Sequence, residues 1–134
     1  MSKVVSLSEA SSLAIHAMVM IAQSKKMINV NVIADATGAS RNHLAKVMQR
    51  LVKGGLVKST RGPAGGFLLN KPSNSITLLN IYEAIEGAID HAGCPLERPI
   101  CPFNKCLMRN LVYKVTDEIK DYFSSQTLDS FIKE

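Results

Sequence analysis

Apolar residues in the first part of the chain recur with the spacing of one helix face. The run follows Ser6, and Glu9 comes three residues later, in the arrangement of a capping box. The apolar positions are Ala10, Leu13, Ala14, Ala17, Met18 and Ile21. This spacing predicts a helix over about residues 7–24.

The next two helices are predicted from their caps and from a second apolar stripe. Asn29 or Asn31 can cap a short helix that Gly38 ends, and Ser40 can cap the helix after it. The stripe of that later helix is Leu44, Val47, Met48, Leu51 and Val52. Its opposite face is basic and amide-rich. Two helices joined through a turn at residues 37–39 predict a helix-turn-helix.

Two short runs of strand-forming residues follow. The glycine pair at 54–55 should stop the helix, and the runs at 56–59 and 67–69 should form two strands. The turn between them reads RGPAGG over residues 61–66, where glycine and proline permit a tight reversal. A helix-turn-helix followed by a hairpin predicts a winged helix.

In the last third of the chain, the sequence predicts a helix, a loop rich in proline and cysteine, and a long helix. Thr77 can cap a helix that Gly87 ends. Residues 88–103 hold three prolines and two of the three cysteines, which favours a loop. Asn104 could then cap a long helix to about Ser125. Its apolar side would be Met108, Leu111, Val112, Val115, Ile119, Tyr122 and Phe123, a face that could pack against a twin, and Thr127 would start a short terminal turn.

The predicted fold is therefore mainly α with a small β-hairpin wing. We expect a winged helix-turn-helix DNA-binding domain over residues 1–87, a cysteine-bearing sensor loop over 88–103, and a dimerisation helix with a C-terminal turn over 104–134. A chain of 134 residues with 46% apolar content can fill one core. The sequence shows neither a membrane-spanning run nor a secretory signal, so we expect a cytoplasmic protein.

Charge is segregated along the chain, although the formal net charge is only +5. Between Asp35 and Glu83 there is no acidic residue. The cations in this stretch are Arg41, Lys46, Arg50, Lys53, Lys58, Arg61 and Lys71. A surface of one sign suits a polyanion, so the stretch predicts a nucleic-acid-binding surface.

Residue types along this stretch suggest a division of roles. Residues 41–43, at the start of the second helix of the pair, could reach base edges in a major groove, while neighbouring polar and cationic residues contact phosphates. Arg61, at the thin tip of the hairpin, would fit a minor groove. The predicted DNA-contacting residues are Ser40, Arg41, Asn42, His43, Lys46, Arg50, Ser59, Arg61, Gly62, Gly65 and Gly66.

The chain resembles the Rrf-two (Rrf2) family of bacterial winged-helix regulators over nearly its whole length. The resemblance rests on SSLAIHAMVMIA, on SRNHLAKVMQRLVKGGLVKSTRGPAGGF, on ITLLNIYEAIEG, and on a cysteine-bearing loop before a long helix. It implies a homodimeric transcription regulator, expected to be a repressor, whose two wings straddle a pseudo-palindromic operator in double-stranded DNA. It also implies a redox-sensing or iron-sensing role. We expect no enzymatic activity, because the sequence offers no substrate-pocket signature or phosphate-cradling loop.

Three cysteines in one short segment of a reducing compartment favour metal or redox chemistry over structural disulfides. Cys94, Cys101 and Cys106 can converge on an iron–sulfur cluster, whose irons usually take four protein ligands, so the loop lacks one. In the resembled family, sensor members bind a 2Fe-2S or 4Fe-4S cluster with similarly spaced cysteines, and some complete it from the first helix. His16 aligns with such a ligand, although it could instead pack against the dimer partner.

Other interpretations of the cysteines stay open. Glu9 and His91 are further candidates for the missing ligand. Thiols beside Arg98 and Lys105 should oxidise readily, which would make a switch without a metal. A regulator that responds through a partner protein would need neither a cluster nor a reactive thiol. An enzyme built on a Cys/His pair would need a third residue to orient that pair, and the sequence offers none. An RNA-binding protein would need exposed aromatic residues for stacking, and the basic region is not expected to expose any.

Overall fold

The computed structural model describes residues 7–89, 102–105, 107 and 110–132. The three cysteines lie outside the described residues, as do Ser6, His91 and Arg98. Predictions that concern those positions, including the sensor loop itself, therefore stay predictions. In the described part of the chain, no helix has the length and apolarity needed to cross a membrane.

The first helix, α1 (Glu9–Gln23), is slightly shorter than predicted. Its N-cap is Ser8 rather than the predicted Ser6, because the Ser8 side chain accepts a hydrogen bond from the backbone N–H of Ser11 at 3.1 Å. That bond satisfies one of the backbone donors that a helix N-terminus leaves without an intrahelical partner.

The predicted helix-turn-helix is confirmed. It consists of α2 (Val30–Thr37) and α3 (Arg41–Lys53). Asn29 caps α2, and Ser40 caps α3 by accepting from the backbone N–H of His43 at 3.1 Å. Gly38, between the helices, has a left-handed φ of 76°, a conformation that favours glycine. Local sequence signals therefore define this unit.

The predicted hairpin is also confirmed, with its strands shifted slightly. Strands β1 (Val57–Thr60) and β2 (Gly66–Leu69) are antiparallel, and Thr60 pairs with Gly66 at the turn. Leu56 was expected to start the first strand. Instead it is buried just before β1, and its N–H donates to the carbonyl of Leu51 at 3.1 Å, the bond of a Schellman motif that ends α3.

Helix α4 (Leu78–Glu86) matches its prediction, with Thr77 and Asn80 in a capping box and Gly87 at its end. A short 3-10 helix, η1 (Ser73–Ser75), precedes it, and another, η2 (Leu128–Phe131), ends the described chain. The last long helix, α5 (Leu111–Ser125), ends where predicted. It does not begin at Asn104, because Asn110 adopts a left-handed φ of 62° that is incompatible with a continuing helix.

One apolar core joins α1, α2, α3, α4 and the hairpin. In α3 the residues at successive helical turns are buried, namely Leu44, Val47, Met48 and Leu51. Val52 was predicted to belong to this stripe, but its side chain is 36% exposed. It lies one position beyond Leu51, which turns it about 100° around the helix and away from the core.

The C-terminal turn packs onto the same core. Leu128 is fully buried, and its N–H donates to the carbonyl of Ile76 at 3.0 Å. The N–H of Leu78 donates to the carbonyl of Gln126, also at 3.0 Å. The segment that follows α5 therefore packs back onto the core that contains α4. The predicted domain limits at 87 and 103 remain predictions.

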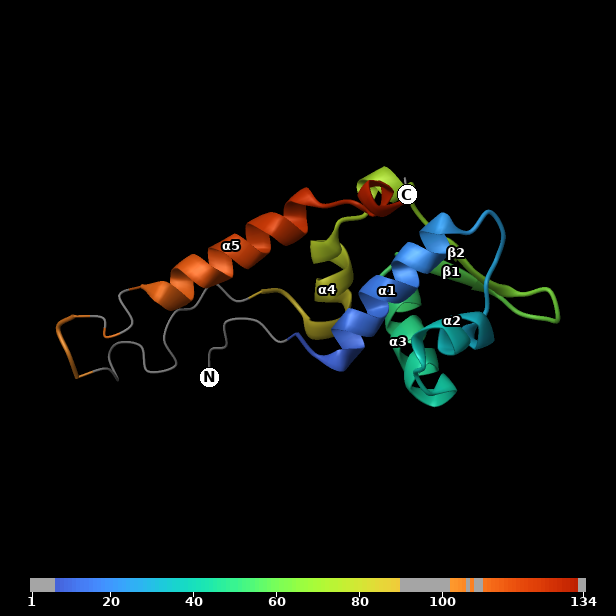
Figure 1. Ribbon diagram of the computed structural model, residues 1–134, viewed down its shortest axis with the longest axis horizontal. Coiled ribbons are helices and arrows are strands. Elements are labelled where there is room, and N and C mark those ends of the chain that lie inside the picture. The colour runs from blue at the N-terminus through green and yellow to red at the C-terminus, as the bar shows by residue number, and fades with distance from the viewer. Residues whose placement is uncertain (1–6, 90–101, 106, 108–109, 133–134) are drawn as a thin grey trace.

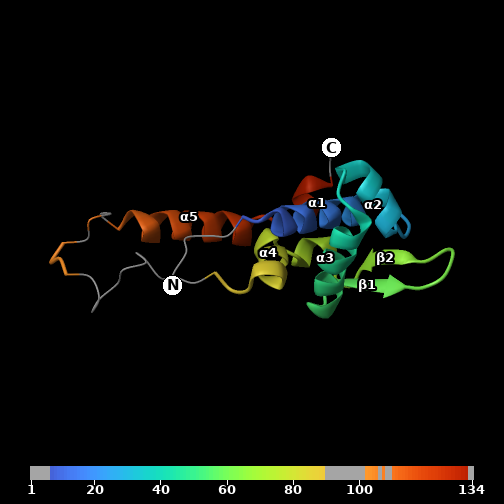
Figure 2. The ribbon, with the colours of Figure 1, turned by 90° about the horizontal axis from the view of Figure 1, so that it is seen from below.

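Helix α5 itself runs out from this body, as Figures 1 and 2 show. Its end near η2 contacts α4, where the rings of Tyr82 and Phe123 meet edge to face with centroids 5.8 Å apart. Thr116 is buried, but the predicted apolar side is not, since Leu111 is 56% exposed and Tyr122 is 53% exposed. The other described residues of this side, Val112, Val115, Ile119 and Phe123, are half-buried in a single chain.

The burial of Leu128 predicts that the C-terminal turn contributes to global stability. We expect Leu128→Ala to lower the free energy of unfolding by about 2–5 kcal/mol, because it leaves a cavity in a packed core. Denaturant titration at fixed protein concentration measures this change. Val32→Ala, at a side chain that is 46% exposed, is the control and should cost under about 1 kcal/mol. Equal effects of the two substitutions would contradict the prediction.

Candidate nucleic-acid interface

Helix α3 and the hairpin lie together on the body of the molecule, while α5 extends in the opposite direction (Figures 1 and 2). The buried stripe of α3 turns its other side outward, where Arg41, Asn42 and Lys46 are exposed. Two elements that are neighbours in sequence thus form one surface. The cations of α3 and of the hairpin that the sequence singled out are exposed, among them Lys46, Lys58 and Arg61.

Arg41 is not free at the start of α3. Its Nε donates to the side-chain oxygen of Asn31, and its Nη2 lies 3.8 Å from a carboxylate oxygen of Asp35. Both partners belong to α2. This exposed ion pair adds little stability, but it directs the guanidinium along the surface of the helix-turn-helix. Asn42, the next residue, is exposed.

His43 lies half-buried between α3 and the start of α1. Its Nδ1 is 3.7 Å from a carboxylate oxygen of Glu9. Glu9 was a candidate metal ligand from sequence, and in the structure its nearest titratable partner among the described residues is His43 rather than His16. The first turn of α1 is thereby close to the first turn of α3.

Arg50 has a different environment from the other cations of α3. Its Nη1 donates to the backbone carbonyl of Ile85 in the last turn of α4, at 3.0 Å. Sequence reasoning assigned Arg50 to a phosphate contact. It could not identify this acceptor, which lies 35 residues away in the chain.

The turn of the wing requires glycine. At Gly65 an added Cβ would lie 2.0 Å from the carbonyl oxygen of Thr60, a distance that no side chain tolerates. Gly62 has a φ of 108°, and its carbonyl accepts from the N–H of Gly65 at 2.9 Å. The resulting narrow tip leaves Ser59 and Arg61 exposed.

A backbone contact that the sequence did not reveal anchors the wing. Ile28, in the link before α2, forms an isolated bridge with Phe67, whose N–H donates to the Ile28 carbonyl at 2.8 Å. Gly66 is buried at this crossing, and an added Cβ would lie 2.6 Å from the same carbonyl oxygen. Ile28 pairs with the wing through one residue only, so the alternating pattern that identifies a strand is absent and the sequence did not predict this contact.

Among the predicted cluster ligands, His16 and Glu9 lie in the part of the chain that the structure describes. The Nδ1 of His16 lies 2.7 Å from the carbonyl oxygen of Ser12, which can only accept, so Nδ1 carries the proton. That tautomer leaves the lone pair of Nε2 available to a metal. Within the described residues, however, no group of three or more histidine, cysteine, aspartate or glutamate side chains could hold a metal ion.

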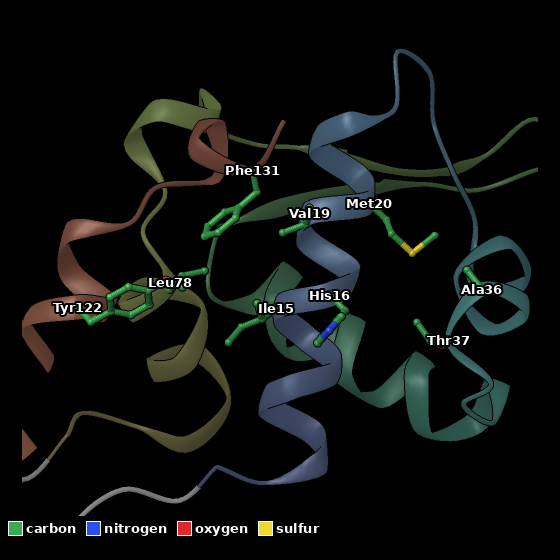
Figure 3. Close-up of a pocket in the computed structure, with 9 residues that line it drawn as sticks. All are labelled: Ile15, His16, Val19, Met20, Ala36, Thr37, Leu78, Tyr122 and Phe131. Carbon is green, nitrogen blue, oxygen red and sulfur yellow. The ribbon is translucent and has the colours of Figure 1, made fainter. Parts of the chain in front are cut away.

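The ring of His16 borders an apolar hollow of about 450 Å³ between α1, α2, the end of α5 and η2 (Figure 3). Ile15 and Val19 of α1 line it together with Tyr122 and Phe131. The hollow is open to the surface and contains few polar groups. It continues the uncovered apolar side of α5 onto α1.

Comparison with known proteins places the chain among regulators. The family model Rrf2, described as "Iron-dependent Transcriptional regulator", matches residues 7–134. The HTH-type transcriptional regulator IscR of Pectobacterium carotovorum is 33% identical over 100 residues, which are 75% of this chain and 61% of that protein. IscR of an Escherichia coli O1:K1 strain is 31% identical over the same share of this chain. The chain thus spans about 61% of the length of these curated relatives.

Solved structures share the fold. CymR of B. subtilis, titled the global cysteine regulator, has a TM-score of 0.79 at 24% identity and covers 96% of both chains. T. potens IscR has a TM-score of 0.77 at 26% identity, covering 96% of this chain and 87% of that one. The predicted winged-helix class is confirmed. The relatives are named as regulators and not as enzymes, in agreement with the expectation that this chain is not an enzyme.

The close approach of Gly66 to Ile28 predicts that the wing depends on glycine at position 66. Gly66→Ala should push the two backbones apart, weaken the bond from Phe67 to Ile28, and lower the free energy of unfolding by about 1–3 kcal/mol. Hydrogen exchange at the Phe67 amide, read alongside the melting temperature, measures the effect. Ala64→Ser at the exposed tip is the matched control. Unchanged protection of the Phe67 amide in the Gly66 variant would refute the anchoring role.

Proposed function

The chain belongs to the Rrf2 family of transcriptional regulators, and on that premise we propose that it is a cytoplasmic, homodimeric repressor that binds duplex DNA in a sequence-specific way. The observation that carries the proposal is the exposure of cations on α3 and the wing, two elements that contribute no acidic residue of their own. The cations at 46, 58 and 61 are exposed there, on a stretch without any acidic residue.

The proposed docking follows from the shape of this surface. The first turn of α3 enters a major groove, where Asn42 can make two hydrogen bonds to an adenine edge. Arg61 on the narrow wing enters the adjacent minor groove, whose negative potential is strongest in A·T tracts. Lys46 and the Ser40 hydroxyl contact phosphates and set the register of α3 on the duplex.

A homodimer is supported by the apolar side of α5. Leu111 and Tyr122 remain exposed in one chain, and the adjoining hollow beside Ile15 and Val19 is apolar as well. A second copy of the chain would remove this surface from water. Two-fold symmetry would then present two α3 helices about 34 Å apart, which suits a pseudo-palindromic operator.

We assign the control of binding to Cys94, Cys101 and Cys106, with His16 as the candidate fourth ligand. Three thiolates and one neutral imidazole fit an iron–sulfur cluster of the 2Fe-2S or 4Fe-4S type, and the tautomer of His16 leaves Nε2 free for that task. A bound cluster would supply a redox-sensitive crosslink between the cysteine segment and α1. The alternative is a cluster-free regulator that responds through thiol oxidation or through a partner protein.

The division of grooves predicts different losses for different variants. Asn42→Ala should reduce discrimination at individual base pairs by about 1–3 kcal/mol, since one bidentate contact is removed. Arg61→Ala should weaken binding most for sites with A·T-rich flanks. Fluorescence anisotropy on duplexes that carry single base-pair changes measures both. Lys71→Ala, at an exposed cation beyond β2, is the control, and a uniform loss for all three variants would reject the assignment of grooves.

The cluster proposal predicts a coloured protein. An anaerobic preparation should absorb in the visible range and contain iron and acid-labile sulfide, and Cys101→Ser should lose both. The measurements are the visible spectrum and the quantification of iron and sulfide. His16→Ala should retain less iron than the unchanged protein if α1 supplies a ligand. A colourless, iron-free anaerobic protein would leave thiol oxidation or a partner protein as the mode of control.

A further inference from the structure

The last turn of α4 is bonded to two other helices at once. Arg50 of α3 donates through Nη1 to the Ile85 carbonyl at 3.0 Å. The hydroxyl of Ser8, which caps α1, donates to the carboxylate of Glu86. We call these two bonds the α4 clamp. It joins the start of α1 and the end of α3 to one short segment.

The bond from Arg50 meets a need of the α4 backbone. The last carbonyls of a helix have no intrahelical donor, and Ile85 is the penultimate residue of α4. A cation at a helix C-terminus is also favoured by the partial negative charge there. The guanidinium of Arg50 satisfies both conditions, and the bond to Ile85 sets its direction although the residue is exposed.

Close packing beside the clamp restricts α3 further. Gly54 follows α3 directly, and an added Cβ there would lie 3.3 Å from the Cβ of Ala84. Such a short distance means that the Ala84 side chain packs directly against the backbone at the end of α3. Lys46, about one turn before Arg50, is exposed and takes part in none of the ion pairs found among the described residues. The two cations of the same helix therefore have different surroundings.

We propose that Arg50 is a positioning residue, and not one of the phosphate contacts that the sequence predicted. It holds α3 at a fixed angle to α4 and thereby sets the direction in which the first turn of α3 enters the groove. This inference rests on the proposed function, since it concerns how the DNA-binding helix is aimed. It also places the clamp immediately before Gly87, after which the chain continues toward Cys94.

The salt dependence of DNA binding separates the two roles. The logarithm of affinity falls with the logarithm of salt concentration by about 0.9 for each phosphate that a cation neutralises. The probe is a duplex selected with the unchanged protein from a random-sequence pool. Lys46→Gln should make this slope shallower by about 0.9 per chain. Arg50→Gln should leave the slope unchanged, yet lower the affinity several-fold at every salt concentration.

Stability provides an independent readout. Arg50→Gln should lower the melting temperature by about 3–6 °C and speed hydrogen exchange in the last turn of α4, because the Ile85 carbonyl loses its donor. Lys46→Gln should change neither. A slope that falls in Arg50→Gln as much as in Lys46→Gln would overturn the inference, and so would an unchanged melting temperature.

A failure of the proposed function can be distinguished from a failure of the inference about Arg50. If the unchanged protein selects no duplex over random sequence, sequence-specific regulation is rejected. The melting temperature and the exchange rates would still decide the clamp, because they require no DNA. A stable Arg50→Gln protein with unaltered exchange in α4 would then reject the clamp as well.

Discussion

The burial of one stripe of α3 is the constraint on which the rest of the structure depends. Leu44, Met48 and Leu51 are fully buried among residues of α1 and α4, and this fixes the rotation of α3 about its own axis. Once that face is inside, Asn42 and Lys46 must lie outside. The hydrophobic effect thus determines which polar residues form the outer surface, without any interaction between those residues themselves.

The wing illustrates a second kind of constraint, the close approach of backbones. At Gly65 and Gly66 an added Cβ would collide with the carbonyls of Thr60 and Ile28. The glycines at these positions therefore permit a tight turn and also let the hairpin dock on the link before α2. A thin and well-anchored wing results, with Arg61 exposed at its tip.

The C-terminal part of the chain has two distinct parts. The turn at η2 closes the core through Leu128, whereas the apolar side of α5 keeps Leu111 and Tyr122 exposed. The end of α5 near η2 packs on α4 through the rings of Phe123 and Tyr82. Arg50 bonds α4 to α3, so few interactions separate the proposed dimer contact on α5 from the proposed DNA-binding helix.

Sequence alone determined the elements whose signals are local. The caps at Asn29, Ser40 and Thr77, and the glycines that end α2 and α4, act within about four residues of where they stand, so they could be recognised without a structure. The acid-free stretch likewise identified the cationic surface. Tertiary structure decided what depends on distant neighbours. Neither the Ile85 carbonyl as the acceptor for Arg50, nor Ile28 as the anchor of the wing, has a local pattern. The late start of α5 at Leu111 depends on a single left-handed residue, Asn110, which helical periodicity does not reveal.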